Sequence, residues 1–330
     1  MRVEAHAAKC TSARGSDIAD MAEVSVLMSV YRPNPDYFRQ QLESINAQTF
    51  DDLELVVWND CPGEPIDREL VTQTVTRFPV TIFEEGRNLG YIGAFGELSR
   101  RARGEYISYC DQDDVWLPEK IQLCMEAIKD NRAVAAVCDR SLMDGQGHVF
   151  CESVRCQSKS CSMTWKTGED ITSRAAFSSY CTGMTLIARR DIVQRFLPFV
   201  PTLPHDQQLA FLLSGAGTIA YVEKPLVRHR RYGTNASGML AGVEKKQDYY
   251  DTRCKPVAEL LDRYERLYPD DARIGDMRAC CRARIDGDIA GLWRYRNLIP
   301  ELYVYEIGLS LCPGFLFGWV KRRFFSKERG

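Results

Sequence analysis

Acidic side chains crowd together in the segment Tyr106–Trp116, which reads YISYCDQDDVW. Its apolar, β-prone start ends at Asp111, and Asp113 and Asp114 follow directly. Like charges this close repel one another, which makes it costly to keep all of them ionised. A hard divalent cation such as Mg²⁺ or Mn²⁺ removes that cost, because it prefers carboxylate and phosphate oxygens as ligands. The segment therefore indicates a cation site that could carry a phosphorylated substrate.

The same segment also allows a plainer interpretation, a solvated acidic turn. Asp114 lies shortly before an expected helix at Leu117–Ile128. Acidic residues are common at helix starts, where they accept hydrogen bonds and interact favourably with the helix dipole. The segment alone does not separate the two interpretations, so the elements around it must decide.

The composition is that of a globular chain. Of its 330 residues, 45% are hydrophobic and 27% charged, and the formal net charge is −2, which argues against a nucleic-acid-binding protein. Met1–Met21 has no apolar core and does not resemble a secretory signal. Thirteen cysteines without a C-x-x-C motif then favour a reduced, cytoplasmic protein. The even spacing of Cys151, Cys156 and Cys161 matches no common zinc module.

Short apolar strands alternate with amphipathic helices in the first half of the chain. We expect strands at 24–30, 53–58, 80–83, 106–110 and 134–137, with helices at 37–47, 68–78, 92–103 and 117–128 between them. This order is typical of a mostly parallel α/β sheet, whose ligand site lies at the carboxyl ends of the strands. Tyr31, Asp60 and Asp111 each follow a strand, so they should meet along that edge.

The second half is less regular. We expect strands at 182–188, 219–222 and 226–229, a helix at 208–214, and long amphipathic helices from about Lys245. The chain therefore divides into a flexible extension (1–22), a catalytic α/β domain (23–244) and a helical C-terminal region (245–330).

The end of the chain combines an apolar run with a basic cluster. Ile307–Val320 is interrupted by Pro313 and is too short for a membrane span. Because Lys321–Arg329 is basic, residues 307–330 suit peripheral contact with an anionic membrane surface. The alternative is a final helix packed on the core, with a solvated basic end.

Six motifs in order give the chain a resemblance to family 2 glycosyltransferases of the GT-A fold, and among them to the bacterial rhamnosyltransferase-like branch. They are SVLMSVY at 25–31, QTF at 48–50, NLG at 88–90, DQDDVW at 111–116, PHDQ at 204–207 and the tract 226–238. The resemblance implies an inverting transfer of a sugar from a nucleotide-diphosphate donor to a glycan or lipid-linked acceptor, in O-antigen, capsule or exopolysaccharide synthesis at the inner face of the plasma membrane. Rhamnose on dTDP is the first guess, and UDP-linked donors remain open.

The resemblance also implies a donor site. Tyr31 would lie beside the nucleotide base, and Asp60 would hydrogen-bond to it. Asn59 stands where the family often has a second Asp. Asn88 and Gly90 would belong to a loop that admits the donor, although a simple turn before the helix explains them equally well.

Metal and catalytic roles follow in the same way. Asp113 would be the direct ligand of Mg²⁺ or Mn²⁺, with Asp111 nearer the ribose or the metal. Arg230 would lie near the donor phosphates, and Asp206 would be the general base, unless it only caps its helix. Branch members commonly carry His two residues after that Arg, whereas this chain has Tyr232, which puts that contact in doubt.

Three residues are candidates for the acceptor or sugar pocket. Gly183 would leave space for the sugar, although Gly within a strand also marks a bulge. His205 would orient the acceptor, unless it is a surface histidine. Trp116 would stack on a sugar, unless it only packs.

Two other functions compete with sugar transfer. A sugar nucleotidyltransferase usually has a Gly-rich, basic loop after its first strand, which Ser29–Pro33 (SVYRP) lacks. A non-catalytic scaffold that binds nucleotide sugars would tolerate the loss of Asp113 or Asp206, and both are present.

Overall fold

A computed structural model describes residues 22–157, 164–232 and 243–320. The extension predicted at 1–22, except for Ala22, and the basic tail from Lys321 lie outside the described residues, as does Cys161 of the evenly spaced cysteines.

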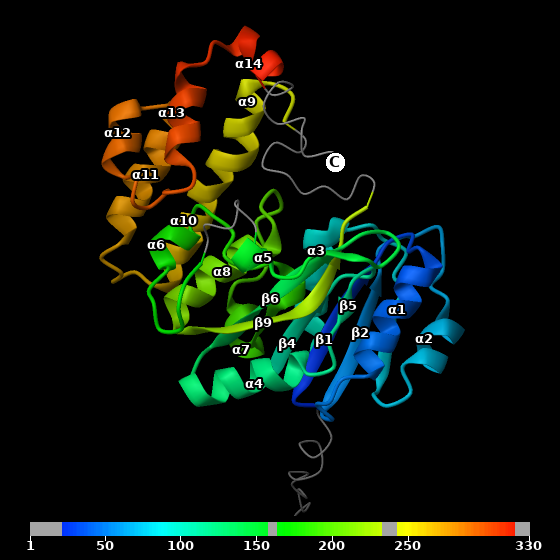
Figure 1. Ribbon diagram of the computed structural model, residues 1–330. Coiled ribbons are helices and arrows are strands. Elements are labelled where there is room, and N and C mark those ends of the chain that lie inside the picture. The colour runs from blue at the N-terminus through cyan, green and yellow to red at the C-terminus, as the bar shows by residue number, and fades with distance from the viewer. Residues whose placement is uncertain (1–21, 158–163, 233–242, 321–330) are drawn as a thin grey trace, which may run out of the picture.

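A twisted sheet of nine described strands forms the centre of the molecule (Figure 1). Its order is β3-β2-β1-β4-β8-β6-β9-β5, with β7 paired to β6. The bounds are β1 Val24–Val30, β2 Leu53–Asn59, β3 Val80–Phe83, β4 Tyr106–Cys110, β5 Val115–Trp116, β6 Ala135–Met143, β7 Val149–Cys151, β8 Leu186–Arg189 and β9 Ile219–Arg230. Strands β3, β2, β1 and β4 are parallel, whereas β8 runs antiparallel to both β4 and β6.

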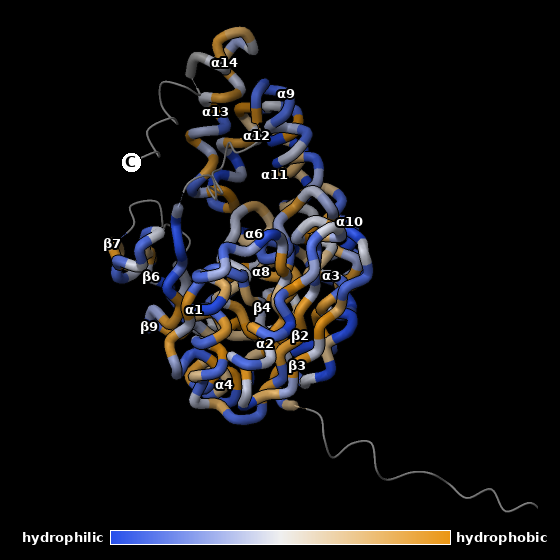
Figure 2. Tube along the Cα trace, turned by 90° about the vertical axis from the view of Figure 1, so that its right-hand side faces the viewer, coloured by the Kyte–Doolittle hydropathy of each residue, from blue (hydrophilic) through white to orange (hydrophobic). Residues whose placement is uncertain are grey.

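Helices cover both faces of this sheet. Apolar side chains of α1, α2 and α4 share one core with one face, and those of α3, α7 and α8 share a second core with the other. The interior is accordingly orange and the outside mostly blue in Figure 2. The helices are α1 Pro35–Asn46, α2 Arg68–Thr74, α3 Gly90–Arg101, α4 Lys120–Asn131, α5 Val154–Gln157, α6 Thr172–Ala175, α7 Arg190–Arg195 and α8 His205–Ala216.

The C-terminal helices pack onto this domain at the carboxyl-end side of the strands (Figure 1). They are α9 Lys246–Tyr249, α10 Lys255–Leu267, α11 Ile274–Asp286, α12 Ile289–Arg294, α13 Tyr303–Leu311 and α14 Gly314–Val320, with a π-helix at Tyr250–Cys254. Tyr264 of α10 stacks on Phe211 of α8 with ring centroids 4.4 Å apart. Buried Arg284 and Glu306 join α11 to α13 at 2.7 Å. Within the described residues, no helix is both long and apolar enough to cross a membrane.

The structure confirms the α/β fold class and changes some element bounds. The two short strands expected at 219–222 and 226–229 form the single strand β9, because the chain passes Pro225 at a register shift opposite Asp139 instead of breaking. The strand expected at 182–188 begins as a 3₁₀ turn, Gly183–Thr185, and only then becomes β8.

Candidate active site

The carboxyl ends of β1 and β4 are joined by an amide. Gln112, which follows β4, accepts a hydrogen bond from the Tyr31 backbone N–H at 2.8 Å and donates one to the Tyr31 carbonyl at 3.0 Å. This pairing holds the acidic turn against the end of β1 and leaves the Tyr31 ring 45% exposed. The exposed ring is therefore available to a ligand at the edge where the sequence places the nucleotide base.

Asp60 ties the end of β2 to the loop before α3. It is 3% exposed, and its Oδ1 accepts hydrogen bonds from the Leu89 N–H at 2.6 Å and from the Trp58 indole at 3.3 Å. In the same loop, Asn88 Oδ1 accepts from the N–H of Gly90, whose φ of +65° favours glycine. Asp60 thus lies beside the loop that carries Asn88 and Gly90, and the role of this loop in donor binding stays a prediction.

Asn59 instead forms hydrogen bonds within the loop after β2. Its amide donates to the Glu64 carbonyl at 2.8 Å, and its oxygen accepts from the Cys61 N–H at 2.9 Å. Asn59 also lines a separate cavity of about 160 Å³ between the ends of β1 and β2. These bonds favour a role in shaping the loop after β2 over the direct donor contact predicted from the sequence.

The three aspartates of the acidic turn have different surroundings. Burial, together with the neighbouring carboxylates of Asp113 and Asp206, raises the pKa of Asp111 to about 7. Burial also raises the pKa of Asp113, although hydrogen bonding to Tyr232 opposes the shift. Asp114 is 1% exposed, and burial raises its pKa well above the usual range. The start of α8 lies close to this turn, since the ring of His205 is 5.1 Å from that of Tyr109 in β4, and the influence of Asp206 on Asp111 agrees with this.

Arg230 supports the acidic turn through hydrogen bonds to Asp113 and Asp114. It is 1% exposed and donates from Nε to the Asp113 carbonyl at 2.8 Å and from Nη2 to Gln40 at 2.7 Å. Its backbone N–H donates to Asp114 Oδ1 at 2.9 Å, and its guanidinium lies over the Tyr37 ring, 4.2 Å from the centroid. These contacts favour a role in positioning Asp113 over the phosphate contact predicted from the sequence.

Tyr232 also contacts the acidic turn. Its hydroxyl donates to Asp113 Oδ2 at 2.8 Å, and its ring meets Tyr37 edge to face with centroids 5.1 Å apart. The residue that replaces the expected His therefore still contacts the carboxylate assigned to the metal.

The chemistry of this turn fits a divalent cation. Mg²⁺ and Mn²⁺ are commonly held by one or two carboxylates together with substrate phosphates. Asp111 and Asp113 supply such oxygens. The raised pKa of Asp111 reflects first its burial and then the neighbouring carboxylates, whose negative charge a cation would offset. The described residues by themselves contain no group of three or more His, Cys, Asp or Glu side chains arranged to hold a metal.

Asp206 is in the first turn of α8 but does not cap it. The N-cap is Pro204, without a side-chain cap, and Asp206 Oδ1 accepts a local bond from the Gln207 N–H at 2.8 Å. The capping alternative raised by the sequence therefore finds no support. Next to it, His205 is 5% exposed and packs against Phe95 with ring centroids 4.4 Å apart.

Gly183 makes room for His205. A Cβ at position 183 would lie 2.8 Å from His205 Nε2, so a larger residue would displace the imidazole. Burial lowers the pKa of His205, and neither ring nitrogen has a hydrogen-bond partner among the described residues. His205 is thus a neutral, buried ring and not the surface histidine considered as an alternative.

Trp116 lies in the core. It is 2% exposed, and the buried ammonium of Lys120 lies over its ring at 3.4 Å from the centroid. A ring in this position cannot stack on a substrate unless the core opens, so the packing alternative is favoured.

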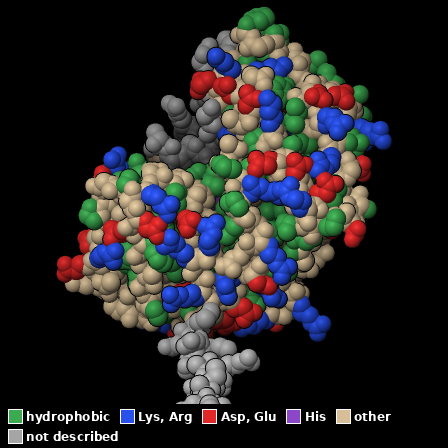
Figure 3. Space-filling model, turned by 180° about the vertical axis from the view of Figure 1, so that it is seen from behind, with side chains coloured by type: hydrophobic (Ala, Val, Ile, Leu, Met, Phe, Trp, Pro, Cys, Tyr) green, Lys and Arg blue, Asp and Glu red, His purple; other side chains and the backbone are tan. Residues whose placement is uncertain are grey.

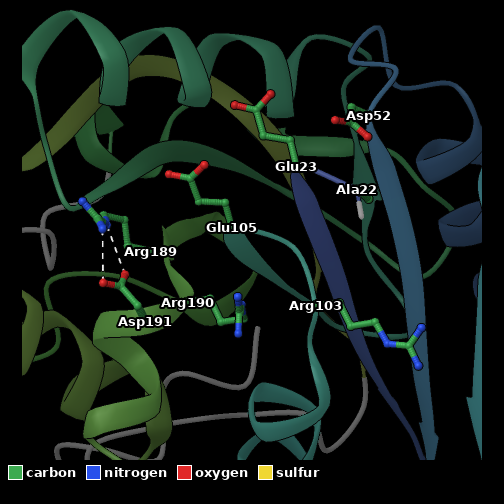
Figure 4. A pocket seen from close by; sticks show the side chains of 8 residues that line it. All are labelled: Ala22, Glu23, Asp52, Arg103, Glu105, Arg189, Arg190 and Asp191. Carbon is green, nitrogen blue, oxygen red and sulfur yellow. Dashed lines mark hydrogen bonds and ion pairs between the residues drawn. The ribbon is translucent and has the colours of Figure 1, made fainter. Parts of the chain in front are cut away.

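A larger cavity lies at the opposite ends of the strands. It has a volume of about 560 Å³ and is lined by acidic and basic side chains in mixture (Figure 4). It therefore lies away from the acidic turn and the start of α8. The lining residues are Ala22, Glu23, Asp52, Arg103, Glu105, Arg189, Arg190 and Asp191.

Two residues of the candidate site were not predicted from the sequence. Gln112 lies between two predicted metal ligands, and an amide among carboxylates is a signal for a structural hydrogen bond. Tyr91 follows directly after Asn88 and Gly90, is 53% exposed, and meets His205 edge to face with centroids 6.1 Å apart. An aromatic residue immediately after a ligand loop is a signal that could have pointed to it.

The sequence of the chain is similar to a known protein family and to known proteins. The model of the family described as glycosyl transferase family 2 matches residues 25–189. Two uncharacterised glycosyltransferases, from Nostoc sp. and Rickettsia prowazekii, are each 25% identical to the chain; the first alignment covers 68% of this chain and 70% of the relative, the second 69% of both.

Two solved structures share the fold. TarS from S. aureus, in complex with UDP-GlcNAc, has a TM-score of 0.55 at 16% identity and covers 91% of this chain and 92% of its own. The mannosyltransferase PcManGT from Pyrobaculum calidifontis, with GDP-Man and Mn²⁺, has a TM-score of 0.51 at 16% identity and covers 89% and 79%. The GT-A fold is confirmed. None of these four proteins is named as a rhamnosyltransferase, so that branch stays a prediction.

Proposed function

Since the chain belongs to glycosyl transferase family 2, we propose that it is an inverting glycosyltransferase that acts on a glycan or lipid-linked acceptor in surface polysaccharide synthesis. The observation that carries this proposal is that the start of α8, which holds Asp206, packs against β4 just before the acidic turn, with the rings of His205 and Tyr109 5.1 Å apart. The aspartates of the acidic turn suit a cation that binds the leaving phosphate, and Asp206 suits the attacking hydroxyl.

The donor nucleotide would lie across the carboxyl ends of β1 and β2. The exposed Tyr31 ring and the buried Asp60 carboxylate flank this position. A carboxylate oxygen can accept the ring N–H that thymine and uracil share. We therefore expect a dTDP- or UDP-linked sugar, and dTDP-rhamnose is the first donor to test.

Asp113 and Asp111 would hold the divalent cation. When bound, the cation stabilises the negative charge that develops on the leaving diphosphate. Arg230, Gln112 and Tyr232 keep the turn in place through the hydrogen bonds described above.

Asp206 would act as the general base. The acceptor oxygen forms its bond to the anomeric carbon while the bond from that carbon to the diphosphate breaks. The hydroxyl proton passes to Asp206, and the nucleoside diphosphate leaves with the bonding electrons. General-base assistance of this kind typically contributes about 10²–10⁴-fold to the rate. Attack opposite the leaving group in a single displacement inverts the anomeric configuration.

An apolar face of the C-terminal region supports contact with a membrane. Val304 and Leu311 are about two helical turns apart on α13, and Phe315 of α14 is 85% exposed. Hydrophobic side chains also gather at this end of the molecule in Figure 3. In the sequence, this face is followed directly by the basic cluster from Lys321. An anionic membrane that carries a lipid-linked acceptor is the matching surface.

Membrane contact is tested by sedimentation with phosphatidylglycerol vesicles. We expect L311E/F315E to lose most of the vesicle binding of the intact chain, whereas F150E, a charge placed on an exposed aromatic of β7, should keep it. Equal sedimentation of the three proteins would contradict the proposal.

The transfer reaction is tested by following sugar transfer and nucleotide release from dTDP- and UDP-sugars. Asp206→Asn should lower kcat by about 10²–10⁴-fold and leave the nucleotide dissociation constant unchanged. If the wild-type protein binds nucleotide sugars but never transfers the sugar, the scaffold alternative holds.

A further inference from the structure

Tyr91 is an exposed aromatic ring at the entrance of the candidate active site. It is the second residue of α3, and 53% of its surface is exposed. The loop before it is fixed by the bonds from Leu89 to Asp60 and from Gly90 to Asn88. The position of the ring is therefore determined by the same contacts that shape this loop.

The ring of Tyr91 lies beside the residue that precedes the proposed base. Its centroid is 6.1 Å from that of His205, with the ring planes at 67°. His205 is in turn fixed by Phe95, Tyr109 and the close approach of Gly183. The contact thus connects Tyr91 to a rigid aromatic wall at the start of α8, where Asp206 also lies.

The charged groups that influence the pKa of Tyr91 agree with this position of the ring. Burial raises the pKa of Tyr91, and the carboxylate of Asp206 adds to the rise. Arg253 opposes it, and Asp111 contributes a smaller rise. The phenol ring is thus close to both carboxylates, and the larger influence is that of the proposed base.

A sugar ring offers the surface that such a site needs. The C–H groups of a pyranose form an apolar face that packs on an aromatic ring, while its hydroxyls point outward to polar groups. A pyranose lying on Tyr91 would direct a hydroxyl toward Asp206, because the ring and the carboxylate lie on the same wall. The donor diphosphate would lie farther along the edge, at the acidic turn.

We propose that Tyr91 is the platform on which the ring of the acceptor sugar stacks, so that the enzyme selects a pyranoside over an acyclic alcohol. This inference rests on the proposed function, since it assigns the acceptor side of the same site. It makes Tyr91 a determinant of acceptor specificity and not of donor binding.

The test compares two probe classes as acceptors with the donor that the wild-type protein uses. Octyl glycosides of rhamnose, glucose, galactose and N-acetylglucosamine present a pyranose ring, and 1-O-octylglycerol presents hydroxyls without a ring. Tyr91→Ala should raise the KM for the pyranosides by about tenfold and leave the KM for 1-O-octylglycerol unchanged. Tyr91→Phe and Tyr91→Trp keep an aromatic face and should retain the wild-type preference.

Trp293→Ala is the matched control, because Trp293 is 57% exposed but belongs to α12 in the C-terminal region. Its kinetics should equal those of the wild type. Donor KM, hydrolysis of the donor without acceptor, and melting temperature should not change in any Tyr91 variant, which separates a platform from a structural role.

Three outcomes would overturn the inference. They are a change in donor KM in place of acceptor KM, equal losses with pyranosides and 1-O-octylglycerol, and saturation-transfer NMR that detects no octyl glycoside on a wild-type protein that binds nucleotide. A wild-type protein that binds no nucleotide would instead contradict the proposed function.

Discussion

The two ends of the central strands carry acidic side chains in opposite electrostatic settings. At the amino ends, Asp191 pairs with Arg189 at 3.1 Å beside the cavity (Figure 4), and Glu23 pairs with Lys129 at 3.0 Å. At the carboxyl ends, burial and neighbouring carboxylates all raise the pKa of Asp111. Asp191 and Glu23 are neutralised within the chain, whereas the acids at the carboxyl ends would be neutralised by the cation that we propose.

The largest expected effect comes from removing a carboxylate at the carboxyl end. Asp113→Asn should lower sugar transfer by about 10³-fold, because a bound cation supplies several kcal/mol of transition-state stabilisation. The matched change at the amino end, Asp52→Asn, should leave the rate unchanged. Initial rates with saturating donor measure both, and equal rates in the two variants would remove the functional distinction between the ends.

A smaller effect, a loss of Mn²⁺ affinity, is expected when a residue that supports the acidic turn is replaced. Arg230→Ala should lower Mn²⁺ affinity by about 10–100-fold, the usual cost of removing a group that orients a metal ligand. Gln40→Ala keeps the arginine and removes one of its partners, so a weaker loss in the same direction is expected. Electron paramagnetic resonance titration of free Mn²⁺ measures the affinity without turnover. Unchanged Mn²⁺ affinity with weakened nucleotide binding would favour the phosphate role predicted from the sequence.

The pH dependence of stability and of Mn²⁺ affinity gives a further test of the acids at the carboxyl end. Without a cation, Asp111 keeps its proton up to about pH 7, compared with an ordinary pKa of 3.8. Since the folded state then binds more protons than the unfolded state between these values, the stability of the cation-free protein should fall as pH rises through this window. Mn²⁺ must displace the proton, so its affinity should rise by up to about tenfold per pH unit and level off above about pH 7. Mn²⁺ titrations and urea unfolding from pH 5 to 8 measure both trends. Asp111→Asn should weaken them but not abolish them, because burial also raises the pKa values of Asp113 and Asp114.

The smallest effect is expected at the amino end. Asp191 and Arg189 are each almost half exposed, and pairs of this kind contribute about 0–1 kcal/mol. Asp191→Asn should therefore change the melting temperature by only a few degrees and leave transfer unchanged. Loss of transfer in this variant would show that the amino-end cavity takes part in function.

The sequence predicts the first half of the fold better than the second. Strands such as Val24–Val30 and Tyr106–Cys110 match their expected bounds because each is a short apolar run between clear breaks. Around Pro225 the pattern misleads, because a proline at a bulge looks like the end of a strand.

Part of the site was predictable and part was not. Asp60, Asp111 and Asp113 follow strands, so topology alone brings them to one edge. The surroundings of Arg230 could not be foreseen, since Gln40 and Asp113 reach it from segments distant in the sequence. Asp206 and His205 meet the acidic turn only through the packing of α8, which no local pattern encodes.

The most direct test of the account is a thermal-shift measurement with UDP, dTDP and their sugars, with and without Mn²⁺, on the wild-type protein and on Asp113→Asn. A nucleotide at 100 times its dissociation constant adds about 2.7 kcal/mol to the free energy of unfolding. We predict a clear rise in melting temperature that requires Mn²⁺ and is lost in Asp113→Asn. Stabilisation that is equal without Mn²⁺ and in the variant, or no stabilisation by any nucleotide, would contradict a cation-assisted donor site at the carboxyl ends of the strands.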